Sequence, residues 1–70
     1  MPELNNRANK LIRSNGWTIL EFNEKMLWLG KEGTGDEITF YKNLTNIKAS
    51  LSPNEFEMVK YLIYFFKAVD

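Results

Sequence analysis

Three close pairs of carboxylates are the side chains in this sequence whose type and spacing best suit acid–base chemistry. General acid–base catalysis, or the binding of a hard cation, would require two carboxylates to converge in one pocket. The pairs are Glu21 with Glu24, Asp36 with Glu37, and Glu55 with Glu57. The first two pairs lie beside predicted turns, where carboxylates are normally solvated, and Glu55 is predicted to cap a helix. We therefore predict no catalytic residue, metal site or cofactor site.

The 70-residue chain contains no cysteine and no histidine. The absence of cysteine excludes disulfides, thiolate zinc sites and thiol nucleophiles. The absence of histidine removes the commonest general base and the commonest metal ligand. Both absences favour a non-enzymatic protein.

The segment Gly33-Thr34-Gly35-Asp36 has the glycine content of a phosphate-binding loop. It lacks the spacing of a P-loop, and it precedes a predicted strand instead of opening a helix. We interpret it as the loop of a β-hairpin.

Arg7, Lys10 and Arg13 follow one another at intervals of three residues, so a helix would place them on one side. Such side chains contact nucleic-acid phosphates. Nine basic residues balance nine acidic ones, however, so the chain has no net field to attract a polyanion. A solvated helix face is the favoured interpretation, and a small nucleic-acid-binding protein is the alternative function.

The elements that would position these residues begin with a helix near the N-terminus. Leu4, Ala8, Leu11 and Ile12 form a narrow apolar stripe at helical spacing. Pro2 and Glu3 suit the start of this helix, and Asn15-Gly16 suits its end.

After Gly16 the pattern indicates three strands, over residues 17–22, 25–30 and 37–42. Short loops between them predict an antiparallel meander. Alternation puts Trp17 and Ile19 on one face and Leu20 and Phe22 on the other, so both faces require cover. Residues 43–50 fit a loop, a helical turn or an extended segment, and the sequence does not choose among them.

The last predicted helix runs from Pro53 to about Val69. Ser52 and Glu55 form a capping box, and Leu51 with Phe56 suits the accompanying hydrophobic staple. Residues 1–70 are thus predicted to form one α+β domain: an N-terminal helix, a three-stranded antiparallel β-meander, and a long C-terminal helix packed on the sheet.

This C-terminal helix carries apolar groups on most of its circumference, whereas a surface helix needs one stripe. One stripe contains Phe56, Val59, Ile63 and Phe66, and the other contains Met58, Leu62, Phe65 and Val69. We expect the surplus face to form a homodimer interface, with candidate residues Met58, Tyr61, Leu62, Phe65 and Val69. The alternatives are that the sheet buries the whole helix, or that the face binds a different protein.

The length of the chain also favours self-association, because a core this small seldom supplies more than about 3–5 kcal/mol. No disulfide or evident metal site supplements it. The sequence shows no signal-peptide pattern and no apolar run long enough to span a bilayer, so we expect a cytoplasmic protein.

Gly16-Trp17-Thr18-Ile19, the strand Met26-Leu27-Trp28-Leu29 and the aromatic C-terminal helix together resemble the small Yopt family of Bacillus SPbeta-type prophages. The resemblance covers the whole chain and rests on size and element order. It implies a prophage-encoded homodimer whose subunit has three strands and a principal helix. It implies no activity and no site residues.

Overall fold

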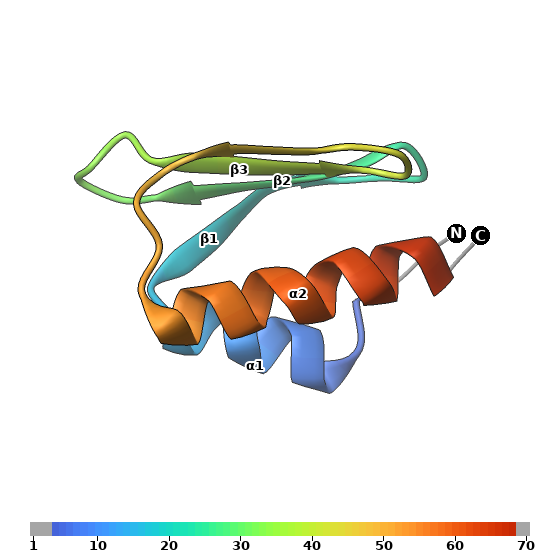
Figure 1. The fold of residues 1–70 in the computed structure, drawn as a ribbon, viewed down its shortest axis with the longest axis horizontal. Helices are drawn as coiled ribbons and strands as arrows, with labels where there is room; N and C mark the ends of the chain where they lie inside the picture. The colour runs from blue at the N-terminus through green and yellow to red at the C-terminus, as the bar shows by residue number, and fades with distance from the viewer. Residues whose placement is uncertain (1–3, 69–70) are drawn as a thin grey trace.

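The structure is a computed structural model that describes residues 4–68. Its elements follow the order α1 (Asn6–Ser14), β1 (Trp17–Phe22), β2 (Met26–Lys31), β3 (Glu37–Tyr41), β4 (Thr45–Lys48) and α2 (Pro53–Ala68). Both helices lie on the same side of the sheet (Figure 1). We call the sheet face that the helices cover the inner face, and the opposite one the outer face.

The sheet has four antiparallel strands in the order β1-β2-β3-β4, so the prediction of three strands was wrong. The additional strand, β4, lies in the segment that the sequence left undecided. β4 is an edge strand, and its residues Thr45-Asn46-Ile47-Lys48 include only one large apolar side chain. Such a composition shows almost no alternation of apolar and polar residues from which a strand could be predicted.

A β-bulge in β1 alters which side chains share a face. Ile19 lies opposite Leu29, but Glu21 lies opposite Trp28, so the register shifts at Leu20. Phe22 is therefore on the inner face with Ile19, where its ring is 6.3 Å from that of Phe66. The prediction that Phe22 faces away from Ile19 was wrong, because simple alternation does not allow for an extra residue in the strand.

Helix α1 begins at Asn6, later than Pro2 and Glu3 suggested; those two residues lie outside the described part. The side chain of Asn5 caps the helix by accepting a 2.8 Å hydrogen bond from the Ala8 N–H. The predicted end at Asn15-Gly16 is confirmed, with Gly16 at a φ of 84°.

Helix α2 begins with the predicted capping box. Glu55 N–H donates to Ser52 Oγ over 3.2 Å, and Ser52 N–H donates to Glu55 Oε1 over 2.9 Å. The helix extends to Ala68, and Val69 lies outside the described residues. Within the described residues, no helix is both long enough and apolar enough to cross a bilayer.

The core lies between the inner face and the two helices. Both predicted stripes of α2 contribute to it, since Val59 and Phe66 come from one stripe and Met58 and Leu62 from the other. Its buried apolar residues are Ala8, Ile12, Trp17, Leu27, Leu29, Ile38, Phe40, Met58, Val59, Leu62 and Phe66. The face of α2 that points into the core is therefore centred between the two stripes.

We expect Leu62→Ala to lower the free energy of unfolding by about 2–5 kcal/mol, because the side chain is fully buried and its removal leaves a cavity. Urea denaturation followed by circular dichroism measures the loss. Lys60→Ala, on the exposed side of the same helix, is the control and should change stability by less than about 0.5 kcal/mol. Equal effects of the two substitutions would contradict this assignment of the helix faces.

Candidate functional site

The five predicted interface residues do not share one surface. Met58 and Leu62 are fully buried inside the single chain, so they have no surface to offer a partner. Tyr61 and Phe65 are half-buried and stack on each other with ring centroids 6.4 Å apart. Val69 lies outside the described residues.

Tyr61 and its neighbours join the two helices. Asn5 Nδ2 donates a 3.0 Å hydrogen bond to the Tyr61 hydroxyl. The guanidinium of Arg7 lies 4.9 Å from the centroid of the Tyr61 ring, within the range of a cation–π interaction. This side of α2 is therefore partly occupied by contacts to α1.

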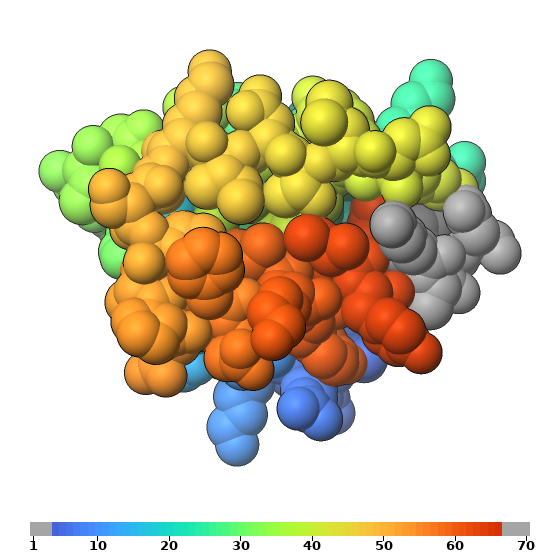
Figure 2. Space-filling model, in the orientation of Figure 1, coloured from blue at the N-terminus to red at the C-terminus, as the bar shows by residue number. Residues whose placement is uncertain are grey.

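The exposed apolar surface of α2 lies on its other flank. Phe56, Ile63 and Tyr64 are spaced as i, i+7 and i+8; Phe56 is 54% exposed and Tyr64 is 76% exposed, whereas Ile63 is half-buried against the core. On β4, Ile47 pairs with the buried Ile38 and so faces inward, yet it is 40% exposed. Figure 2 shows β4 and α2 on one face of the molecule. We call Ile47, Phe56, Ile63 and Tyr64 the α2–β4 surface.

This surface exists because the helices cover only part of the inner face. Helix α1 packs on β1, and α2 packs on β3 and on α1. The inner side of β4 therefore extends beyond α2. An inward-facing isoleucine left partly in water is the direct result.

The predicted basic residues are all exposed on α1. Arg7, Lys10 and Arg13 lie away from Ala8 and Ile12, the side of the helix that is buried. Within residues 4–68, no ion pair involves Lys10 or Arg13. The structure thus gathers three cations on one helix, as the spacing predicted.

Of the predicted carboxylates, Glu55 is buried, with a side chain only 8% exposed. Its Oε2 accepts hydrogen bonds from Trp17 Nε1 and from Lys31 Nζ, both over 2.8 Å. The hydrogen bonds from Lys31, Ser52 and Trp17 lower the pKa of the Glu55 carboxyl from 4.5 to about 2, although burial acts in the opposite direction. Glu55 is thus ionised at neutral pH. Its carboxylate oxygens already accept hydrogen bonds from Trp17, Lys31 and Ser52, which suits a structural role.

The pairs Glu21–Glu24 and Glu55–Glu57 do not form acidic centres. Glu21 accepts a 2.8 Å hydrogen bond from the Asn23 side chain in the β1–β2 turn. Glu57 lies on the surface and pairs with Lys60 over 3.1 Å. In the described part of the chain, no three acidic side chains are grouped closely enough to hold a metal ion.

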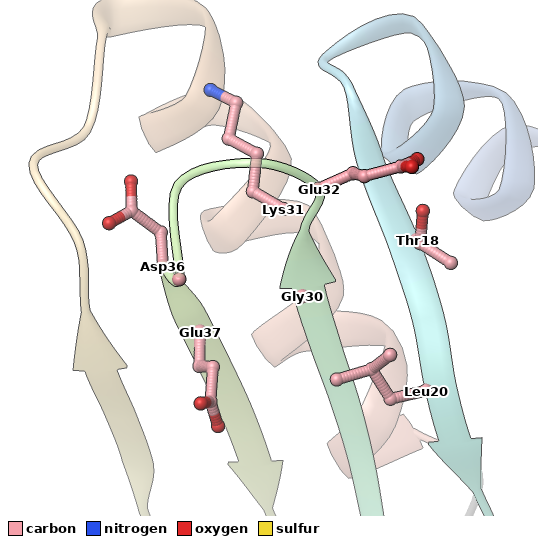
Figure 3. Close-up of a pocket in the computed structure, with 8 residues that line it drawn as sticks. Thr18, Leu20, Gly30, Lys31, Glu32, Asp36 and Glu37 are labelled. Atoms are coloured by element: carbon pink, nitrogen blue, oxygen red, sulfur yellow. The ribbon is translucent and has the colours of Figure 1, made fainter.

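The predicted hairpin loop of Gly33-Thr34-Gly35-Asp36 is confirmed between β2 and β3. Lys31 N–H donates to the Asp36 carbonyl over 3.0 Å, and Gly33 and Gly35 both have positive φ values. Beside this loop, on the outer face, is a pocket of about 360 Å³ (Figure 3). We call it the hairpin pocket; its lining includes Leu20, Gly30 and Asp36.

Three features of these surfaces were not predicted from the sequence. The open edge of β4 lacks an apolar pattern, and the hairpin pocket depends on the close packing of Leu20 over Gly30 of the neighbouring strand. The contact of Trp17 and Lys31 with Glu55 joins residues far apart in the chain. The capping box was the one local signal that pointed to Glu55.

Comparisons with protein-family models, with curated proteins and with solved structures found no match to this chain.

We expect acid to weaken the fold by protonating Glu55. The pKa of Glu55 is about 2 in the folded chain, below the ordinary glutamate value of 4.5 that applies when the chain is unfolded. The stabilisation from its charge is therefore complete above pH 4.5 and declines as the pH falls from 4.5 toward 2. Glu55→Gln should lower the free energy of unfolding at pH 7 by about 2–3 kcal/mol. The difference from the parent protein should shrink on acidification.

Urea denaturation at pH 7, 4.5 and 3 measures this difference. Glu57→Gln is the control, because its carboxylate is exposed and removing it should leave the pH dependence unchanged. A difference between Glu55→Gln and the parent that is the same at pH 7 and pH 3 would rule out this role for the Glu55 charge.

Proposed function

We propose that the chain is a small non-enzymatic interaction protein that acts as a homodimer. The observation that carries the proposal is the α2–β4 surface, where Ile47, Phe56 and Tyr64 are 40–76% exposed. Leaving such side chains in water forgoes about 1.5–3 kcal/mol for each one. A domain of 70 residues without disulfides has little stability to spare.

The backbone of β4 supports a second copy as the partner. Tyr41 N–H donates to the Leu44 carbonyl over 2.7 Å, and Leu44 N–H donates to the Tyr41 carbonyl over 3.4 Å. Hydrogen-bonded pairs alternate with non-bonded pairs along an antiparallel ladder. The backbone groups of Asn46 therefore bond to β3, and those of Thr45 and Ile47 point away from the sheet.

This alternation suits a twofold axis at Asn46. Antiparallel pairing of two β4 strands about that axis puts Thr45 of one copy opposite Ile47 of the other. Each such pair exchanges two backbone hydrogen bonds. Because both helices lie on the inner face, the two copies of α2 would flank the axis, with the exposed flanks of Phe56 and Ile63 between them. Each copy would cover the apolar surface that the other leaves open.

We expect Ile47→Pro to yield a folded monomer. Proline removes an N–H that points away from β3, so it costs no hydrogen bond within the chain, but it interrupts the proposed pairing of the two edges. Asn46→Ala is the matched control and should remain a dimer. Light scattering at micromolar concentration gives the mass, and circular dichroism verifies folding.

A parent protein that remains an 8.2 kDa monomer would overturn the homodimer. A dimer that persists in Ile47→Pro but is lost in Tyr64→Glu would overturn only the edge pairing and leave α2 as the interface.

A second candidate function is nucleic-acid binding through α1. The observation that favours it is the set of three exposed cations, Arg7, Lys10 and Arg13, on a helix with no acidic residue. In the proposed dimer the two α1 helices lie at opposite ends, each covering its own β1. Two separate basic faces would result on the helical side of the dimer.

If α1 contacts nucleic acid, Lys10→Glu with Arg13→Glu should abolish binding to generic duplex or single-stranded DNA in a gel shift at low salt. Reversal of two charges replaces phosphate attraction by repulsion. Lys25→Glu with Lys48→Glu changes the net charge equally at other positions and should leave the shift in place. No shift with the parent protein would remove this candidate.

A further inference from the structure

The sheet has a free edge at β1, opposite the β4 edge of the proposed dimer. A cavity of about 390 Å³ lies beside it, lined by Trp17, Thr18 and Ile19 of β1 and by Ile12 and Arg13 of α1. Its lining includes inward-facing and outward-facing residues of β1 and no residue of β2, so the cavity lies along the edge of the strand. We call it the α1–β1 groove. A groove beside consecutive residues of an edge strand suits an extended polypeptide segment.

The backbone of β1 turns hydrogen-bonding groups toward this groove. Lys31, which lies opposite Trp17, donates its N–H to the carbonyl of Asp36 on the β3 side and so does not bond to β1. Because bonded and non-bonded pairs alternate along an antiparallel ladder, Thr18 bonds to β2, and the N–H and C=O groups of Trp17 and Ile19 point away from the sheet. An added strand could exchange hydrogen bonds with these groups.

The groove has a defined length. Trp17 is only 3% exposed, so the groove closes toward the start of β1, whereas Thr18 is exposed and Ile19 is half-buried. Beyond Ile19 the bulge shifts the register, and outward-pointing backbone groups no longer recur at every second residue. The groove therefore suits a short segment, with the backbone of Ile19 as its main anchor.

The two sides of the groove carry opposite charges. Arg13 lines the α1 side, and within residues 4–68 no ion pair involves it. Lys10 is exposed nearby on α1, a helix without an acidic residue. On the outer side, Figure 3 shows the side chain of Glu32 extending toward Thr18. A partner that complements both sides needs a negative charge toward α1 and none toward the outer face.

We propose that the α1–β1 groove binds a short extended segment of another protein, with an acidic side chain toward α1 and a neutral or basic one toward the outer face. Residues directly opposite each other in a ladder have side chains on the same face. The residue opposite Ile19 therefore lies on the helical side, toward Arg13, and the residue opposite Thr18 lies beside Glu32. The site does not depend on the proposed dimer, because that dimer uses the other edge of the sheet.

Charge selects this occupant over a second copy of the chain and over nucleic acid. Pairing of two β1 edges would bring together two α1 helices, each with Arg7, Lys10 and Arg13 exposed, and these like charges repel. Nucleic acid has no peptide backbone to continue the ladder, and Glu32 repels its phosphates. An acidic extended segment provides both the backbone and the charge.

The probe for the test is an acetylated and amidated peptide of alternating glutamate and valine, added to the labelled full chain. Amide hydrogen exchange is followed by two-dimensional NMR. We expect the Ile19 amide to exchange about tenfold more slowly at saturating peptide, because its N–H gains an acceptor. The Thr18 amide already bonds to β2, so its exchange should change little.

Arg13→Glu should weaken binding of this peptide about three- to tenfold. Lys25→Glu makes the same change of charge in the β1–β2 turn and should weaken binding less than about twofold. Both side chains are exposed, so both variants should remain folded.

Unchanged exchange of the Ile19 amide at saturation, or equal losses in the two variants, would overturn the proposal. Equal binding of a peptide in which lysine replaces glutamate, or equal slowing of the Ile19 amide by single-stranded DNA, would also overturn it. Slowed exchange confined to Thr45 and Ile47 would place the peptide at the β4 edge instead, which equally contradicts this site.

Discussion

The buried carboxylate of Glu55 is the interaction on which the arrangement of helices and sheet depends. It caps α2 through Ser52, and it accepts hydrogen bonds from Trp17 at the start of β1 and Lys31 at the end of β2. Since Trp17 and Lys31 are paired across the sheet, one side chain sets where the first turn of α2 meets one end of the β1–β2 ladder. A buried charge is tolerated here because all its partners are donors. The remainder of α2 then follows over the core.

Holding α2 at this position determines which surfaces remain open. The helix covers β3 and contacts α1, so the inner side of β4 is only partly covered, and no helix lies over the outer face. The two surfaces differ in chemistry. The α2–β4 surface is neutral and apolar, with Ile47 from β4 and Phe56 and Tyr64 from α2, which suits the proposed second copy. The outer face carries Leu20, Trp28 and Tyr41 between charged residues, among them Glu32 and Glu37.

Local signals predicted most of the fold. The capping box at Ser52 and Glu55 marked the start of α2, and aromatic and β-branched residues marked β1, β2 and β3. The fourth strand was missed because its side chains, Ile47 apart, are polar. The face of Phe22 was wrong because a bulge reverses alternation. The helix stripes did not show that Met58 and Leu62 are core, since that depends on packing against strands distant in the chain.

The chain has a net charge of zero, but the fold distributes its charged side chains unevenly over the surface. Helix α1 carries Arg7, Lys10 and Arg13 without an acid, while Glu32, Asp36 and Glu37 lie at the β2–β3 hairpin with their side chains directed apart (Figure 3). Because both helices lie on the inner side of the sheet, the basic helix α1 and the outer face are on opposite sides of one small domain. In the proposed dimer, a twofold axis at β4 would put the two α1 helices at opposite ends, far from the interface. The proposed edge pairing would therefore leave the basic face of α1 exposed in each copy.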